Sequence, residues 1–365
     1  VQTCSLPIYI EKIEKTYIIP QDSLYIYGIA ILMMVWHHFF GFPERFGGDL
    51  RYIGGNIEYT IELYLGYFGR LCIAMYAFIS GYGMMAKSMQ KNLKFTEDIK
   101  LAIKQIIKFF IRYWIVFIIF VSIGFKFMGL KFEPEEFIKN FIGKSCSYNA
   151  EWWYVAYYVK MLIMYPVIKL IVNKLNFIKN SKWIIFALAI ILGIINTVFK
   201  ENYTYYLCFL FGMLIYENRL YEKFNAKLCK NEFYSIIISI GCIIFSVIVR
   251  MILTFDVDAF LVMIYIFGCL QILKTIKNNK WPGNILQFLG HYSVYIWLTH
   301  TFFLYYYFQN QFMQLKYAIL IYIVTVCICL FIGVGLDKIY KGLMQGIKFG
   351  RKKSNSVRFK KIYRK

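Results

Sequence analysis

Apolar runs separated by short polar segments recur along almost the whole chain. Most reach the roughly 17 to 25 residues that an α-helix needs to cross a hydrocarbon core of about 30 Å. Reading the runs against glycine, proline and charged residues predicts an all-α, polytopic membrane protein with about ten transmembrane helices. The expected spans are 24–42, 63–86, 105–128, 152–172, 183–199, 203–216, 234–253, 257–274, 286–308 and 317–340.

The composition supports lipid as the solvent. The 365 residues are 59% hydrophobic and 20% aromatic but only 17% charged, a balance that a water-soluble domain of this size rarely has. Most of the nine cysteines lie in apolar runs, where a thiol behaves as a small hydrophobic group, so no disulfide framework is expected. We expect a multi-pass protein of the plasma membrane.

The formal net charge of +22 is not spread evenly. With the amino terminus in the cytoplasm, the inner segments hold 30 of the 42 lysines and arginines and the outer segments hold nine. This asymmetry follows the positive-inside rule and predicts that both termini are cytoplasmic. We expect the positive charge to meet anionic lipid of the inner leaflet rather than nucleic acid.

The same reading divides the chain into three parts. Residues 1–23 form a cytoplasmic amino-terminal segment, residues 24–342 form the ten-helix membrane domain, and residues 343–365 form a basic cytoplasmic tail. Val1–Ile8 resembles a translated sequencing adapter, so we expect it not to be native and exclude it from fold reasoning.

Four polar side chains from three spans fall at a similar expected depth. His37 and His38 lie about 20 Å from the cytoplasmic end of the first span, His300 reaches a similar depth in the ninth, and Arg70 lies about 10 Å below the outer surface. An arginine or lysine at the centre of a spanning helix costs about 2.5 to 3.5 kcal/mol. One isolated histidine is more often a helix-packing hydrogen bond. A co-planar set favours a catalytic site.

The chemistry of these groups suits proton transfer. Imidazole, with an ordinary pKa of about 6.5, can take a proton from a hydroxyl group and return it. The second histidine or Arg70 can stabilise an oxyanion. No metal site is expected.

Four motifs in order along the chain resemble the membrane acyltransferase superfamily known as acyltransferase type three, over residues 24 to about 340. They are Tyr27-Gly-Ile-Ala-Ile-Leu-Met-Met-Val-Trp-His-His38, Phe78-Ile-Ser-Gly-Tyr-Gly-Met84, Trp152-Trp-Tyr154 leading to Pro166, and Gly290-His-Tyr-Ser-Val-Tyr-Ile-Trp-Leu-Thr-His300. The resemblance implies a ten-helix plan. It also implies transfer of acetyl or other acyl groups from cytoplasmic acyl-CoA to sugars of surface polysaccharide, lipopolysaccharide or peptidoglycan, with no permanently bound cofactor.

The resemblance also implies roles for single residues. The essential first-span histidine of the family falls on His38, and Tyr27, which shares its helix face, stands where members often carry a donor-binding arginine. Where the family has a pair of arginines that holds the CoA phosphates, this chain offers Lys104, Lys108 and Arg112 on one helix face. Positive-inside anchoring explains Lys104 and Lys108 equally well, so Arg112 is the better candidate for the donor site.

The fourth span begins with a group of residues that we expect at the acceptor. Trp152, Trp153 and Tyr154 fit either an interfacial aromatic belt or a platform that stacks on a sugar ring. Glu151 is a candidate partner for a sugar hydroxyl, and Lys160 either faces the same cavity or snorkels outward. A further candidate, Ser293, either orients His300 or makes an intrahelical hydrogen bond.

The leading hypothesis is acyl transfer from acyl-CoA to a glycan or glycolipid, with His38 as general base or acyl carrier. The main alternative is a multi-span transporter or flippase that uses His38, Arg70 and His300 to bind its substrate or a proton. A polysaccharide polymerase or ligase is a third hypothesis, but the outer loops are short for it.

Overall fold

The computed structural model describes residues 17–46, 50–55, 60–175, 203–253, 257–275 and 280–362, with four single residues between 187 and 194. Within these described residues, seven helices are long and apolar enough to cross a membrane. They cover Pro20–Phe40, Ile61–Gln90, Phe95–Phe127, Ala150–Lys174, Glu232–Ile252, Asp258–Thr275 and Ala318–Ile347. The chain is therefore an all-helical, multi-pass membrane protein, and these seven helices match seven of the expected spans.

The other three expected spans differ from one another. The sixth corresponds to α8, Thr204–Glu217, which is apolar but only 14 residues long. The ninth corresponds to α12, Lys280–Thr301, a helix of 22 residues whose polar side chains lower its hydropathy. Most of the fifth, 183–199, lies outside the described residues. The count of ten and the cytoplasmic placement of both termini remain predictions.

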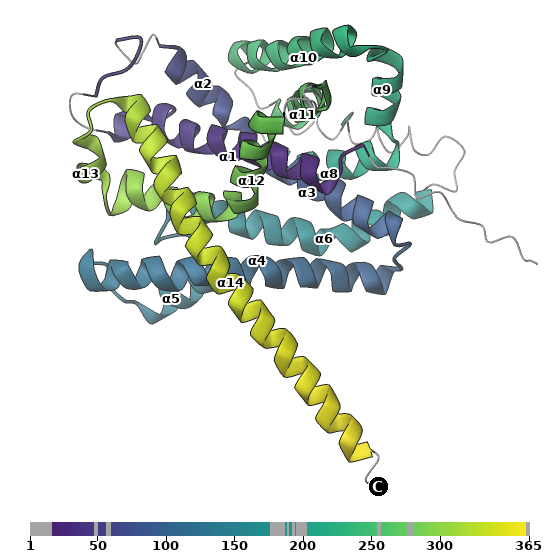
Figure 1. Ribbon diagram of the computed structural model, residues 1–365, viewed down its shortest axis with the longest axis vertical. Coiled ribbons are helices and arrows are strands. Elements are labelled where there is room, and N and C mark those ends of the chain that lie inside the picture. The colour runs from purple at the N-terminus through teal and green to yellow at the C-terminus, as the bar shows by residue number, and fades with distance from the viewer. Residues whose placement is uncertain are drawn as a thin grey trace, which may run out of the picture.

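The helices lie side by side in a bundle, and α14, Ala318–Ile362, crosses it diagonally (Figure 1). The part of α14 beyond the bundle continues as helix into the segment expected to be a basic tail. Besides α8 and α12, the labelled elements are α1 Pro20–Phe40, η1 Pro43–Arg45, α2 Ile61–Gly69, α3 Leu71–Gln90, α4 Phe95–Phe127, α5 Pro134–Phe141, η3 Ala150–Trp153, α6 Tyr154–Leu175, α9 Leu220–Leu228, α10 Glu232–Ile252, α11 Asp258–Thr275, η5 Phe302–Tyr306, α13 Gln309–Met313 and α14 Ala318–Ile362.

Two glycines bring α1 and α12 together. A Cβ atom on Gly28 would lie 2.0 Å from the carbonyl oxygen of Leu286, and one on Gly290 would lie 1.9 Å from that of Leu24. No side chain fits at such distances, so the backbones of the two helices are in direct contact. Residues 24–28 meet residues 286–290 and, further along both helices, His38 meets His300, so the two helices run parallel.

A buried ion pair fastens α3, α4 and α6 to one another. Lys169 Nζ lies 2.6 Å from Asp98 Oδ2 and donates to the carbonyl oxygen of Leu93 at 2.9 Å. Ser88 donates to Asp98, and Tyr165 donates to the same carboxylate at 3.4 Å. Because both charges are buried, each depends on the other for its stability in the apolar interior.

Candidate active site

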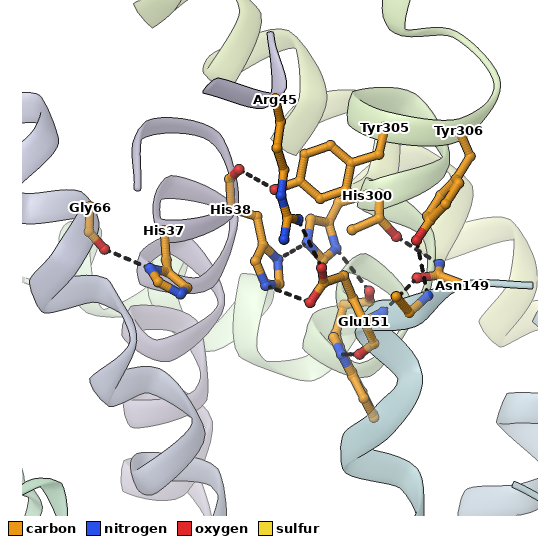
Figure 2. A network of polar contacts seen from close by, with 12 residues as sticks. His37, His38, Arg45, Gly66, Asn149, Glu151, His300, Tyr305 and Tyr306 are labelled. Atoms are coloured by element: carbon orange, nitrogen blue, oxygen red, sulfur yellow. Dashed lines mark hydrogen bonds and ion pairs between the residues drawn. The ribbon is translucent and has the colours of Figure 1, made fainter. Parts of the chain in front are cut away.

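His38 near the end of α1 and His300 near the end of α12 form one hydrogen-bonded pair (Figure 2). The distance from His38 Nδ1 to His300 Nε2 is 2.6 Å, and the two rings are nearly parallel, 8° apart. Their exposed fractions are 6% and 0%. The sequence predicted that the two imidazoles share a depth, and the structure brings them into contact.

Backbone carbonyls fix the proton positions of this pair. His300 Nδ1 lies 3.0 Å from the carbonyl oxygen of Ile296 and 2.8 Å from that of Trp297. Carbonyl oxygens only accept hydrogen bonds, so Nδ1 carries a hydrogen and Nε2 of neutral His300 is an acceptor. His38 therefore donates from Nδ1. The other nitrogen of His38, Nε2, is left as its basic atom.

The basic nitrogen of His38 faces a carboxylate. His38 Nε2 lies 3.3 Å from Glu151 Oε2, and the other oxygen of Glu151 is 3.0 Å from Arg45 Nη1. The guanidinium of Arg45 lies over the rings of Phe42 and Tyr305, at 4.2 and 4.8 Å from the centroids. The structure thus assembles a chain of four polar groups: Arg45, Glu151, His38 and His300.

The loop that carries Glu151 is anchored to the segment after His300. Glu151 N donates to Asn149 Oδ1 at 3.1 Å, and Asn149 Nδ2 donates to Thr301 Oγ1 at 2.7 Å. The backbone of the same loop donates from Ala150 N to the hydroxyl of Tyr306 at 2.9 Å. Phe302–Tyr306 is a π-helical turn, a form that often occurs at functional sites.

His37 belongs to a different contact. Its Nδ1 lies 2.7 Å from the carbonyl oxygen of Gly66, and Figure 2 shows the ring on the far side of α1 from His300. Adjacent residues on a helix point about 100° apart, so only one of the two histidines can meet α12. His37 is therefore not a member of the histidine pair.

A first cavity, which we call the Arg112 cavity, has a volume of about 190 Å³. Among the donor-site candidates, Tyr27, Lys108 and Arg112 line it, whereas Lys104 is exposed outside it. Its walls also include Met34, His38, Ile73, Tyr76, Ser80, Gln105, Phe109, Glu151, Trp153, Tyr154, Tyr158, Ser293, Val294 and Trp297. The sequence did not single out Tyr76, Ser80, Gln105 and Tyr158 as site residues, although each lies within about three helical turns of a residue that it did predict.

Polar groups are distributed along this cavity from end to end. Arg112 lies 4.1 Å above the ring of Tyr340, and Tyr27 stacks on Tyr76 with centroids 5.3 Å apart. Within the described part of the chain, the buried hydroxyl of Tyr154 has no hydrogen-bond partner. The cavity therefore joins a cationic end at Lys108 and Arg112 to a polar end at His38.

A second cavity, the Arg70 cavity, has a volume of about 650 Å³. It is lined by His37, His38, Gly41, Phe42, Tyr67, Arg70, Ile73, Glu151, Trp153, Tyr157, Thr204, Tyr205 and Arg250. Four of these residues, His38, Ile73, Glu151 and Trp153, also line the Arg112 cavity. His38 and Glu151 thus stand at the junction of the two spaces.

Several sequence predictions need correction here. Trp152 is buried, donates to the carbonyl oxygen of Leu298 at 3.1 Å and packs on Tyr113, so it belongs to neither an interfacial belt nor a sugar platform. Lys160 is exposed beside Tyr157 and lines neither cavity. Ser293 lines the Arg112 cavity but does not orient His300, whose Nδ1 is held by backbone carbonyls.

Arg45 and Arg250 were not predicted as site residues. The sequence placed both among the outer positive charges, and nothing in its pattern shows which outer charges fold back over the bundle. The only available signal for Arg45 is its position, seven residues after His38 in a short Pro-containing turn.

A multi-pass helical protein with a buried histidine–carboxylate cluster between two cavities has the features of an enzyme embedded in the membrane. The model of the acyltransferase 3 family, described as an acyltransferase domain, matches residues 25–334. The chain belongs to this family of membrane acyltransferases. No curated protein and no solved structure matches it.

The family match confirms the resemblance seen in the motifs and the prediction of an acyltransferase. It favours acyl transfer over the transporter and polymerase hypotheses. The family also implies an acyl donor and an acceptor.

Proposed function

We propose that this protein transfers an acyl group, in the simplest case acetyl, from cytoplasmic acyl-CoA to a hydroxyl of a glycan or glycolipid on the outer side of the plasma membrane. The observation that supports the proposal most directly is the junction of the two cavities. His38 and Glu151 line both, so a donor and an acceptor that enter separately can reach the same nitrogen atom.

In this proposal the donor enters the Arg112 cavity. Arg112 and Lys108 bind the phosphates of CoA, since guanidinium and ammonium groups form strong charge-assisted hydrogen bonds with phosphate. The acylated arm then extends between Tyr27, Tyr76 and Tyr154 toward His38. The unpartnered hydroxyl of Tyr154 is available to an amide of that arm.

The acceptor hydroxyl binds next to His38 Nε2, which takes its proton as the oxygen attacks the thioester carbonyl. The new carbon–oxygen bond forms, the carbon–sulfur bond breaks, and the CoA thiolate leaves and receives the proton from Nε2. Glu151 stabilises the imidazolium, while His300 accepts the hydrogen bond from Nδ1 and keeps Nε2 directed at the junction. Transfer of the acyl group to Nε2 itself is the other chemistry open to this atom.

The test uses purified protein in lipid nanodiscs with labelled acetyl-CoA and envelope glycan from cells that lack the protein. We expect release of free CoA that depends on added glycan, and label in the glycan by mass analysis. His38→Ala should reduce the rate by about 10² to 10⁴ or more. A Lys160→Ala variant is the matched control, because Lys160 lines neither cavity. Wild-type turnover by His38→Ala would overturn the proposal.

One further measurement separates the two roles of His38. Exchange of labelled CoA into acetyl-CoA in the absence of glycan requires an acyl-enzyme, and its absence indicates direct attack by the acceptor.

A further inference from the structure

The Arg70 cavity holds two arginines that the transfer chemistry at His38 does not use. Arg70 lies at the junction of α2 and α3, and Arg250 lies near the end of α10. Both line the cavity, together with His38 and Glu151. Charged groups within a membrane protein are rare and mark sites of function, so two guanidiniums in one cavity require an explanation.

Arg250 is held in place from one side. Its Nε lies 2.7 Å from Asp258 Oδ1, and Asp258 is fully buried at the start of α11. A guanidinium has five N–H donors in a rigid plane, and a carboxylate at Nε leaves its terminal amino groups to other partners. The carboxylate of Asp258 thus balances the charge of Arg250 on the Nε side of the guanidinium.

The same cavity has an aromatic wall. Trp153 packs on Tyr205 at 5.5 Å and on Tyr157 at 5.4 Å between centroids, and all three residues line the cavity. Flat aromatic faces with hydrogen-bonding edges suit the faces of sugar rings. The cavity volume of about 650 Å³ falls within the range of about 300 to 1,000 Å³ for small-molecule sites.

We propose that the acceptor is an anionic glycan, whose carboxylate or phosphate group binds Arg250 and Arg70 while its reactive hydroxyl lies at His38. Planar guanidiniums recognise both of these anions by paired hydrogen bonds. Glu151 does not oppose this arrangement, because the guanidinium of Arg45, 3.0 Å away, balances its charge. This inference rests on the proposed function and specifies its acceptor.

Three matched probes test the charge preference. They are p-nitrophenyl β-glucoside, the corresponding β-glucuronide and the 6-phosphate of the glucoside, which differ only at the sixth carbon. We measure equilibrium binding to the full-length protein in nanodiscs of neutral phosphatidylcholine. We expect at least one anionic probe to bind about tenfold tighter or more than the glucoside. The glucuronide and phosphate arms identify which anion the site prefers.

Substitutions test whether Arg70 and Arg250 cause the tighter binding of the anionic probes. Arg70→Gln and the double variant Arg250→Gln/Asp258→Asn should each reduce it to about threefold or less, with little change for the neutral probe. The double variant avoids leaving Asp258 buried without its partner. Arg51→Gln is the matched control, since Arg51 contacts Tyr317 and lines neither cavity.

Equal or undetectable binding of all three probes would overturn the inference, as would an anionic preference that survives both variants. The His38→Ala protein should keep the preference, because binding of the anion does not need the chemical step. Absence of the preference in the wild-type protein, together with intact acyl transfer, contradicts this inference alone. An intact preference without any acyl transfer contradicts the proposed function alone.

Discussion

His38 and His300 are 262 positions apart in the chain, yet their ring nitrogens lie 2.6 Å from each other. His300 is fully buried and lines neither cavity, so it reaches a substrate only through His38. Its place in the hydrogen-bonded chain makes it a positioning residue. Its side chain decides which nitrogen of His38 carries the hydrogen.

The role of His300 can be measured by substitution. His300→Ala removes the acceptor for His38 Nδ1, so the imidazole loses its fixed tautomer. We expect kcat to fall about 10- to 100-fold with little change in the KM for acyl-CoA, and the pH–rate profile to change. His291→Gln is the control, because His291 is a half-exposed histidine of the same helix that contacts Asp337. A changed KM at constant kcat would contradict the positioning role.

Arg45 should control the carboxylate beside His38. In Arg45→Ala, Glu151 loses its charged partner at 3.0 Å and can turn away from His38 Nε2. We expect kcat to fall about tenfold or more, and Arg45→Lys to recover only part of it, because lysine lacks the planar group that stacks between Phe42 and Tyr305. Full activity of the alanine variant would show that Glu151 holds its position without Arg45.

Arg112 should act on donor binding alone. Arg112→Gln removes one charged contact to phosphate, which is worth about 1.5 to 3 kcal/mol, so the KM for acyl-CoA should rise about 10- to 100-fold. The rate at saturating donor should change little. The matched variant Lys104→Gln alters an exposed residue on the same helix outside the cavity and should leave the KM near its wild-type value. Equal effects of the two variants would argue against a donor site in the Arg112 cavity.

The buried ion pair between Asp98 and Lys169 should matter for stability. Asp98→Ala leaves the Lys169 ammonium buried without its partner, which costs about 3 to 5 kcal/mol. We expect a clear drop in Tm of the detergent-solubilised protein. The double variant Asp98→Ala/Lys169→Met removes both charges and should recover most of the loss. A double variant no more stable than the single one would show that the pair does more than neutralise charge.

Acid should loosen the loop between α5 and η3. Hydrogen bonds from Ser147, Lys139 and Ser145 hold the pKa of the Glu136 carboxyl below its ordinary value of 4.5. The ionised carboxylate therefore stabilises the loop above that ordinary value, and the stabilisation is lost as the pH falls through the lowered pKa. The protection of residues 142–149 against hydrogen exchange, corrected for the intrinsic exchange rate at each pH, should be lower at about pH 3 than at pH 7, whereas a Glu136→Gln variant should show low protection at both values. High protection in that variant at pH 7 would mean that other contacts hold the loop.

The sequence predicted the depth of the site residues along their helices better than the direction in which their side chains point. Counting 1.5 Å per residue along apolar runs placed His38 and His300 in one layer, and the structure agrees. The same count could not decide which of His37 and His38 faces α12, because a small error in helix phase exchanges neighbours. The resemblance of the motif to its family selected His38.

Arg45, in a turn, and Arg250, near the end of α10, were the main omissions. Hydrophobic periodicity does not show which residues beyond or near a helix end fold over the bundle, so the sequence only counted both among the outer charges. Trp152 shows the opposite error. The sequence assigned this residue to an interfacial aromatic belt or a sugar-binding platform, whereas the 3-10 turn of η3 directs it into the core.

The close contact of α1 and α12 constrains the number of residues between each contact glycine and its histidine. Gly28 and Gly290 join the two parallel backbones, and His38 and His300 each follow ten residues later. The two helices therefore have segments of equal length between the glycine contact and the hydrogen-bonded histidine pair. One residue inserted into either segment would swing its imidazole by about 100°, so we expect natural variation here to exchange residues but not to add or remove them.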